Sequence, residues 1–153
     1  MSFSLNNETG PVALQDRVQR STTMTPDVMT NAIGHRSFLL WDSAAKARIV
    51  RLIDSGAFTD AALALVELEA PDWNLRSLLY DDHEWHCFLS KRNVLTVDLD
   101  EIAEASHAVL PLAILDAIVA ARSISMAARE VRSKSVPTVR PTRGYPVCCD
   151  NFS

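Results

Sequence analysis

Residues 71–90 read PDWNLRSLLYDDHEWHCFLS, and the fold depends on this stretch. Between Glu84 and Ser90 apolar and polar side chains alternate, which is the period of a half-buried β-strand. One face carries Trp85, Cys87 and Leu89, and the other carries Glu84, His86 and Ser90. Residues 73–80 fit a second strand, and the intervening residues Asp81, Asp82 and His83 have turn chemistry. We therefore expect an antiparallel hairpin.

Upstream of Pro71 the apolar residues recur with the 3.6-residue period of amphipathic helices. Asp42 and Ser43 offer an N-cap for a helix that ends at Ser55 and Gly56, and Thr59 caps a second helix that Pro71 terminates. Because few residues join these two helices, they should form a helical hairpin. A shorter helix over about 26–33 is predicted from Thr25, Pro26 and Asp27, with Gly34 directly after its end.

Downstream of the hairpin, residues 94–97 are expected to add a third strand, and Asp98 or Asp100 to cap a helical piece through about Ala105. Pro111 fits only the first turn of a helix, because deeper placement would remove a hydrogen bond. The helix that it begins should continue to about Arg132, with Asp116 lying away from the apolar face. That face consists of Leu112, Leu115, Ile118 and Val119.

These elements predict an α+β protein, with a small antiparallel sheet of two or three strands packed against helices in the order α-α-β-β-α. A chain of 153 residues has room for one ordinary domain. Residues 1–24 are rich in Ser, Thr, Asn and Gln and are predicted to be disordered. The domain should span 25–132. Residues 133–153 form a flexible tail with prolines and arginines that ends in CCDNFS.

The composition, 48% hydrophobic and 22% charged, is typical of soluble globular proteins. The N-terminus lacks a basic region followed by an apolar one, so no signal peptide is expected. The apolar stretch 108–121 is shorter than the roughly 20 residues needed to span a bilayer. Three cysteines do not make a disulfide scaffold. We expect a reduced, cytoplasmic protein without membrane association.

Charge is unevenly distributed along the chain. Residues 42–121 contain 14 acidic and 6 basic side chains, whereas residues 122–143 contain 6 basic and one acidic. An acidic body disfavours nucleic-acid binding, which requires a basic face. The basic segment can attract an anionic partner, or it can simply keep the tail solvated.

Four motifs carry a resemblance: the helical run 61–66 (AALALV), Pro71-Asp72-Trp73, residues 84–87 (EWHC) and the run 110–115 (LPLAIL). In this order they resemble small bacterial proteins that are similar to the phage-type α-β-α (ABA) sandwich family. The resemblance covers about 59–122 and implies a helix–sheet–helix fold. It brings no activity and no functional residues.

Residues His83, His86 and Cys87 invite a metal site, with His107 and the acids Asp81, Asp82 and Glu84 nearby in sequence. Strand geometry argues against it, since adjacent residues of a strand point to opposite faces. A catalytic pairing of Cys87 with His107 or His83 would need an exposed, activated thiol, but Cys87 shares its face with Trp85 and Leu89. Trp73 and Trp85 are expected in the core. We predict no catalytic residue, no metal site and no cofactor.

The C-terminal segment is the candidate interaction motif. It consists of Cys148, Cys149, Asp150, Asn151, Phe152 and Ser153. It can act as a peptide ligand, a soft-metal clip or a redox-sensitive handle, or it can be an unconstrained chain end. The function predicted first is a non-catalytic accessory or interaction module whose sheet face or tail contacts another protein. A metal- or redox-responsive protein that uses the cysteine pair comes second, and a small hydrolase or transferase third.

Overall fold

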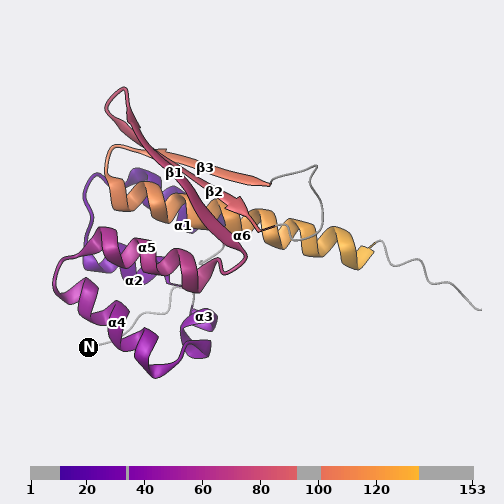
Figure 1. Cartoon of the computed structure of the whole chain (residues 1–153), viewed down its shortest axis with the longest axis horizontal. Helices are drawn as coiled ribbons and strands as arrows, with labels where there is room; N and C mark the ends of the chain where they lie inside the picture. The colour runs from indigo at the N-terminus through magenta and orange to yellow at the C-terminus, as the bar shows by residue number, and fades with distance from the viewer. Residues whose placement is uncertain (1–10, 34, 93–100, 135–153) are drawn as a thin grey trace, which may run out of the picture.

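In the part of the chain that the structure describes, helices precede and follow a three-stranded sheet. The computed structural model describes residues 11–33, 35–92 and 101–134, and Figure 1 shows their arrangement. The elements are α1 (Pro11–Arg20), α2 (Pro26–Ala32), α3 (His35–Leu40), α4 (Ser43–Asp54), α5 (Phe58–Glu69), β1 (Trp73–Asp81), β2 (Glu84–Lys91), β3 (Ile102–His107) and α6 (Leu110–Lys134). The predicted α+β class and the order of helices, strands and final helix are confirmed.

Side-chain caps fix the starts of two helices. The Thr25 hydroxyl accepts a hydrogen bond from the Val28 amide and begins α2, and Pro26 occupies the first helical position. The Asp42 carboxylate accepts from the Ala45 amide at 2.6 Å and begins α4. Both caps confirm the sequence prediction, whereas Gly34 lies outside the described residues.

Helices α4 and α5 form the predicted helical hairpin. The turn between them contains Gly56, which adopts a φ of +75°, a backbone conformation that costs a glycine little. The predicted cap at Thr59 is wrong: the N-cap position is Ala57, two residues earlier, so α5 begins at Phe58 and has no side-chain cap. Burial of its apolar side, including Ala61, Leu65 and Val66, stabilises α5 without one.

The sheet is antiparallel with the strand order β1-β2-β3. The pairs Asp81–Glu84 and Tyr80–Trp85 close the hairpin around Asp82 and His83, whose φ values of 46° and 67° define a two-residue turn of type I′. Arg76 is the extra residue of a bulge between Leu75 and Ser77. The aromatic rings of Tyr80 and Trp85 contact each other on one side of the hairpin, with centroids 5.0 Å apart.

The third strand is not where the sequence suggests. The predicted strand at 94–97 lies outside the described residues, and the predicted helical piece that ends near Ala105 is wrong. Ile102–His107 forms β3, because it pairs with Trp85–Ser90 and buries Ala103 and Ala105. Alanine and glutamate favour a helix locally, but the neighbouring strand decides the conformation.

Helix α6 is the core element. Pro111 occupies its first turn as predicted, and the next residues through Val119 are buried without a break. Asp116 is among them, which corrects the prediction that it lies away from the apolar face. By length and hydropathy α6 could also cross a membrane, but 56% of its most apolar 18-residue stretch is buried inside the fold. Core helices of folded domains can have the same length and hydropathy.

The N-terminal segment contains a further correction. Residues 11–20, predicted to be disordered, form α1, and Val18 within it is fully buried. Helix α1 packs against α6, so the folded unit extends beyond the predicted boundary at residue 25. The flexible C-terminal tail remains a prediction, because residues 135–153 lie outside the described part of the chain.

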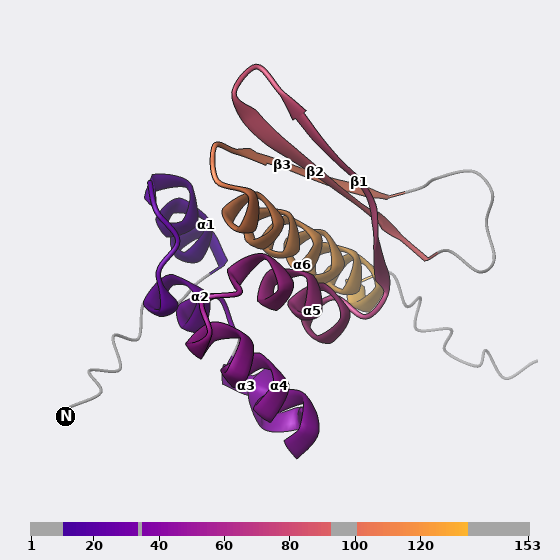
Figure 2. The same ribbon diagram turned by 60° about the vertical axis from the view of Figure 1, so that its left-hand side comes forward.

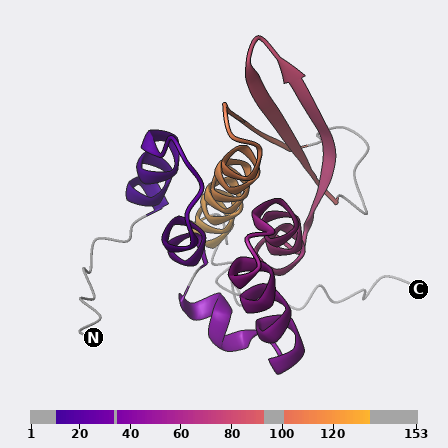
Figure 3. The same cartoon turned by 90° about the vertical axis from the view of Figure 1, so that its left-hand side faces the viewer.

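The layers are seen best along the axis of α6. Figures 2 and 3 show the sheet as one layer, α6 directly beneath it, and the other helices farther from the sheet. Among the described residues all helices lie on the same side of the sheet, unlike a sandwich with helices on both faces. Two polar contacts connect the layers: Trp73 donates from Nε1 to the Ser125 hydroxyl at 3.1 Å, and Arg122 lies 3.4 Å from the buried Glu69 carboxylate.

Replacement of His83 by glycine should stabilise the protein by about 0.5–1 kcal/mol, because glycine adopts a positive φ without steric cost. The measurement is the free energy of unfolding in urea. Glu84→Gly, at the neighbouring strand position, is the control and should destabilise the protein. A stability loss in His83→Gly as large as that of the control would contradict the turn geometry.

Candidate functional site

The two faces of the sheet differ in what covers them. The register aligns Leu78, Cys87 and Ala105 on one face and Leu75, Leu89 and Ala103 farther along the same face. Cys87, Leu89, Ala103 and Ala105 are all buried there. This inner face lies against α6, as Figure 3 shows.

The opposite face is uncovered in the described structure, and we call it the outer face. It consists of Asn74, Ser77 and Leu79 of β1, His86, Phe88 and Ser90 of β2, and Ile102, Glu104 and Ser106 of β3. Leu79 is 55% exposed and Ile102 is 46% exposed, while Phe88 at the centre is half-buried. Two aliphatic side chains and an aromatic ring therefore contact solvent on one small surface.

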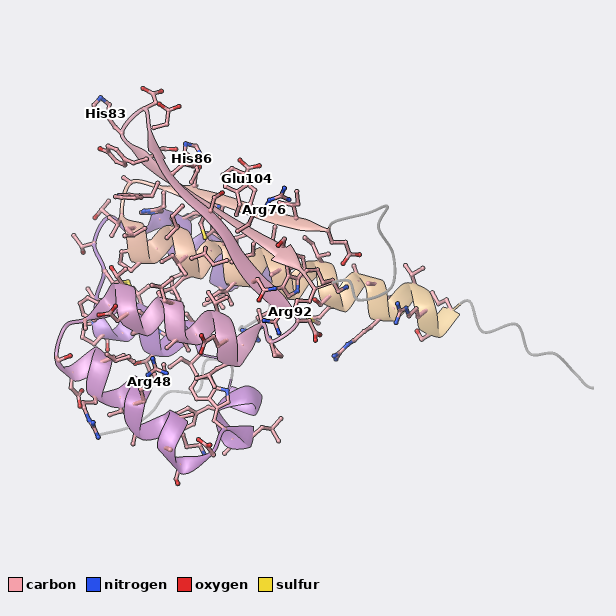
Figure 4. The ribbon with its side chains drawn as sticks, in the orientation of Figure 1. Arg48, Arg76, His83, His86, Arg92 and Glu104 are labelled. Atoms are coloured by element: carbon pink, nitrogen blue, oxygen red, sulfur yellow. The ribbon has the colours of Figure 1, made fainter. Side chains whose placement is uncertain are left out.

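Polar groups surround this apolar centre. Phe88 is paired with Ser77 on one side and Glu104 on the other, and His86 is paired with Leu79 and Ser106. Figure 4 shows His86 and Glu104 on the side of the sheet that faces away from the helices, and His83 at the tip of the hairpin. The outer face thus has both hydrogen-bonding and apolar groups, as the core and rim of protein interfaces do.

One end of the sheet is held rigid by polar contacts. The Lys91 ammonium lies 2.6 Å from the Glu101 carboxylate, and the Lys91 amide donates to the Glu101 carbonyl. On the other edge the Arg92 amide donates to the Asp72 carbonyl, and Arg92 Nε donates to the Asn74 side chain at 3.1 Å. These bonds fix the ends of the strands that carry Asn74 and Ile102.

The residues that suggest a metal or nucleophile in the sequence do not converge. Cys87 lies on the inner face, His86 on the outer face and His83 at the hairpin tip. His107 ends β3, and its Nδ1 accepts a hydrogen bond from the Val109 amide at 2.9 Å. In the described residues no group of three His, Cys, Asp or Glu side chains is placed to hold a metal ion.

Burial also determines the chemistry of Cys87. The side chain is fully buried, and desolvation raises the pKa of its thiol to about 12. The thiol is therefore protonated at neutral pH, whereas a nucleophilic cysteine must be a thiolate. The arrangement supports a structural role for Cys87, as the alternation in the sequence predicts.

The candidate motif of the sequence, Cys148 to Ser153, lies outside the described residues. The structure instead singles out Leu79, Phe88 and Ile102, which sequence analysis did not group. The signal was present for Phe88, because strict alternation places it on the face of His86. Ile102 could be assigned only once β3 was known.

Comparisons with protein-family models, with curated proteins and with solved structures find no match to this chain. The resemblance to ABA sandwich proteins therefore stays a prediction. The fold and the outer face define the class of protein at hand: a small α+β domain in which, among the described residues, one sheet face is covered and the other is not.

Cys87 should react with a thiol reagent only after unfolding, since it is buried and protonated. The measurement is the rate of labelling at each cysteine, located by mass spectrometry, in native protein and in denaturant. Cys87→Ser should cost about 1–3 kcal/mol of unfolding free energy, because it buries a hydroxyl. Fast labelling of Cys87 in the native protein would contradict its placement on the inner face.

Proposed function

We propose that this chain is a non-catalytic interaction module and that the outer face of its sheet binds another protein. The observation that carries the proposal is the apolar group of Leu79, Phe88 and Ile102 on an uncovered sheet face. The solvent-exposed face of an antiparallel sheet normally carries polar residues. Exposed aliphatic residues around an aromatic ring on such a face therefore favour a binding surface.

The size of the face determines what kind of interface it supports. Three strands about 4.8 Å apart, with about six paired residues each, present roughly 300 Å². A standard stable interface needs about 800 Å² from each partner. The outer face alone therefore supports a weak, reversible contact, and a stable complex requires further contacts from outside this face.

Charge indicates the chemical class of the partner. The segment 42–121, which includes the whole sheet, has more than twice as many acidic as basic residues. Such a surface repels nucleic acids and anionic lipids. A protein whose contact surface has apolar side chains for Leu79, Phe88 and Ile102 and a basic group for Glu104 fits the outer face best.

Site-specific photocrosslinking in the source cells tests the proposal. A photoreactive phenylalanine analogue at Leu79 or at Ile102 should give the same protein adduct. Leu40 and Met126, which are also exposed apolar residues but lie on helices, are the control positions and should not give it. Absence of the adduct at both sheet positions, or equal adducts at the control positions, would refute the outer face as the binding surface.

Substitution of an apolar residue of the face then measures its contribution. Leu79→Lys should weaken binding of the partner found by crosslinking by about 2 kcal/mol, which is about 30-fold in the dissociation constant, because burial of the leucine is lost. The matched control is Leu40→Lys, the same change at a position that is 87% exposed on α3. Equal effects of the two substitutions would mean that Leu79 is not at the interface.

A further inference from the structure

Helix α6 carries a carboxylate, that of Asp116, which is buried beside α1 and has few polar partners. Asp116 of α6 is only 2% exposed, and unlike the buried carboxylate of Glu69 it has no arginine at ion-pair distance among the described residues. Its Oδ2 accepts a hydrogen bond from the Gln19 side chain at 3.3 Å, and its Oδ1 is buried without a hydrogen-bond partner. Burial of an ionised carboxylate without a cationic partner is costly.

The helix that covers Asp116 is held by few contacts. In α1 only Val18 is fully buried, Leu14 and Gln15 are half-buried, and most other described side chains are exposed. Its ion pair, between Asp16 and Arg20, lies on the exposed side. A helix of ten residues does not persist alone in water. Helix α1 therefore depends on its docking against α6.

Side chains from α1 and β3 influence the ionisation of Asp116. From α1 these are the neutral amides of Gln15 and Gln19, and from β3 it is the imidazole of His107. Desolvation raises the pKa of Asp116, while the two amides and a charged His107 act to lower it. The Nδ1 atom of His107 itself accepts a hydrogen bond from the Val109 amide at 2.9 Å.

We propose that α1 is a proton-controlled cover of α6: uptake of a proton by Asp116 tightens the docking of α1, and ionisation of Asp116 loosens it. The protonated carboxyl group has no charge to desolvate and gains an O–H donor for a glutamine carbonyl oxygen. When α1 leaves, water can reach the ionised carboxylate and remove the cost of burying it. This cover lies on the helical side of the molecule, and the inference does not depend on the proposed outer-face interaction.

The sign of the pH dependence follows from the direction of the pKa shift. The docked state holds the proton of Asp116 more tightly than the undocked state does. Docking therefore becomes more favourable as the pH falls through the raised pKa toward the ordinary aspartate range, and this gain is lost as the pH rises. Ordinary acid unfolding has the opposite sign, because it weakens docking as the pH falls.

Hydrogen exchange of the full chain, followed by mass spectrometry, tests the proposal. Protection of the α1 amides, corrected for intrinsic exchange rates, should rise as the pH falls from 7.5 to 4, relative to the amides of β2. Asp116→Asn, which mimics the protonated form, should give high α1 protection that does not change across this range. Asp81→Asn removes an exposed carboxylate and should behave as the parent protein does.

Two further variants keep the test decisive. Gln19→Leu removes the donor to Asp116 and should lower α1 protection at pH 7.5 while the pH dependence remains. This variant tests the proposal even if Asp116→Asn does not fold. His107→Gln should retain the pH dependence. The proposal is overturned if α1 protection is independent of pH in the parent protein, or if His107→Gln abolishes the dependence and Asp116→Asn does not.

Discussion

Packing on helix α6 is the interaction on which the rest of the structure depends. An isolated three-stranded sheet is marginal in water, and so are helices of ten to twelve residues. The inner face of the sheet, α5 and α1 all bury their apolar residues against α6. Many of the contact residues are small, such as Ala105 of β3 and Ala113, Ala117 and Ala121 of α6. Since alanine has no long side chain, the elements can approach closely although the chain contains few aromatic residues.

Because α6 occupies a single face of the sheet, the two faces have different roles. The inner face contains Cys87 and Leu89 and contributes to stability, whereas the outer face keeps Leu79 and Ile102 in contact with solvent. The small area of the outer face limits it to a weak, reversible contact, and the acidic character of the sheet region disfavours anionic partners. On the opposite side of α6, the carboxylate of Asp116 lowers the stability of the α1 contact, which an apolar residue at this position would not do.

The sequence predicts the parts of the fold that are determined locally. The Thr25 and Asp42 caps, the hairpin around Asp82 and the placement of Pro111 follow from side-chain chemistry and spacing. Parts that tertiary contacts determine were missed. Helix α1 is stable only against α6, β3 only beside β2, and Asp116 is buried although an acid normally lies at the surface. The candidate site was half predictable, since alternation assigns Phe88 to the outer face but does not locate Ile102 opposite Ser90.

The central claim is that α6 covers one face of the sheet, whereas none of the described helices covers the other. It can be measured directly by nuclear magnetic resonance of the whole chain with a soluble paramagnetic agent, which broadens the signals of protons that solvent reaches. Our account predicts strong broadening for the side chains of Leu79, Ile102 and Phe88, and little for Cys87, Leu89 and Ala105. If the signals of both sets showed equally little broadening, the account would be contradicted, because the outer face would then be covered in the free protein.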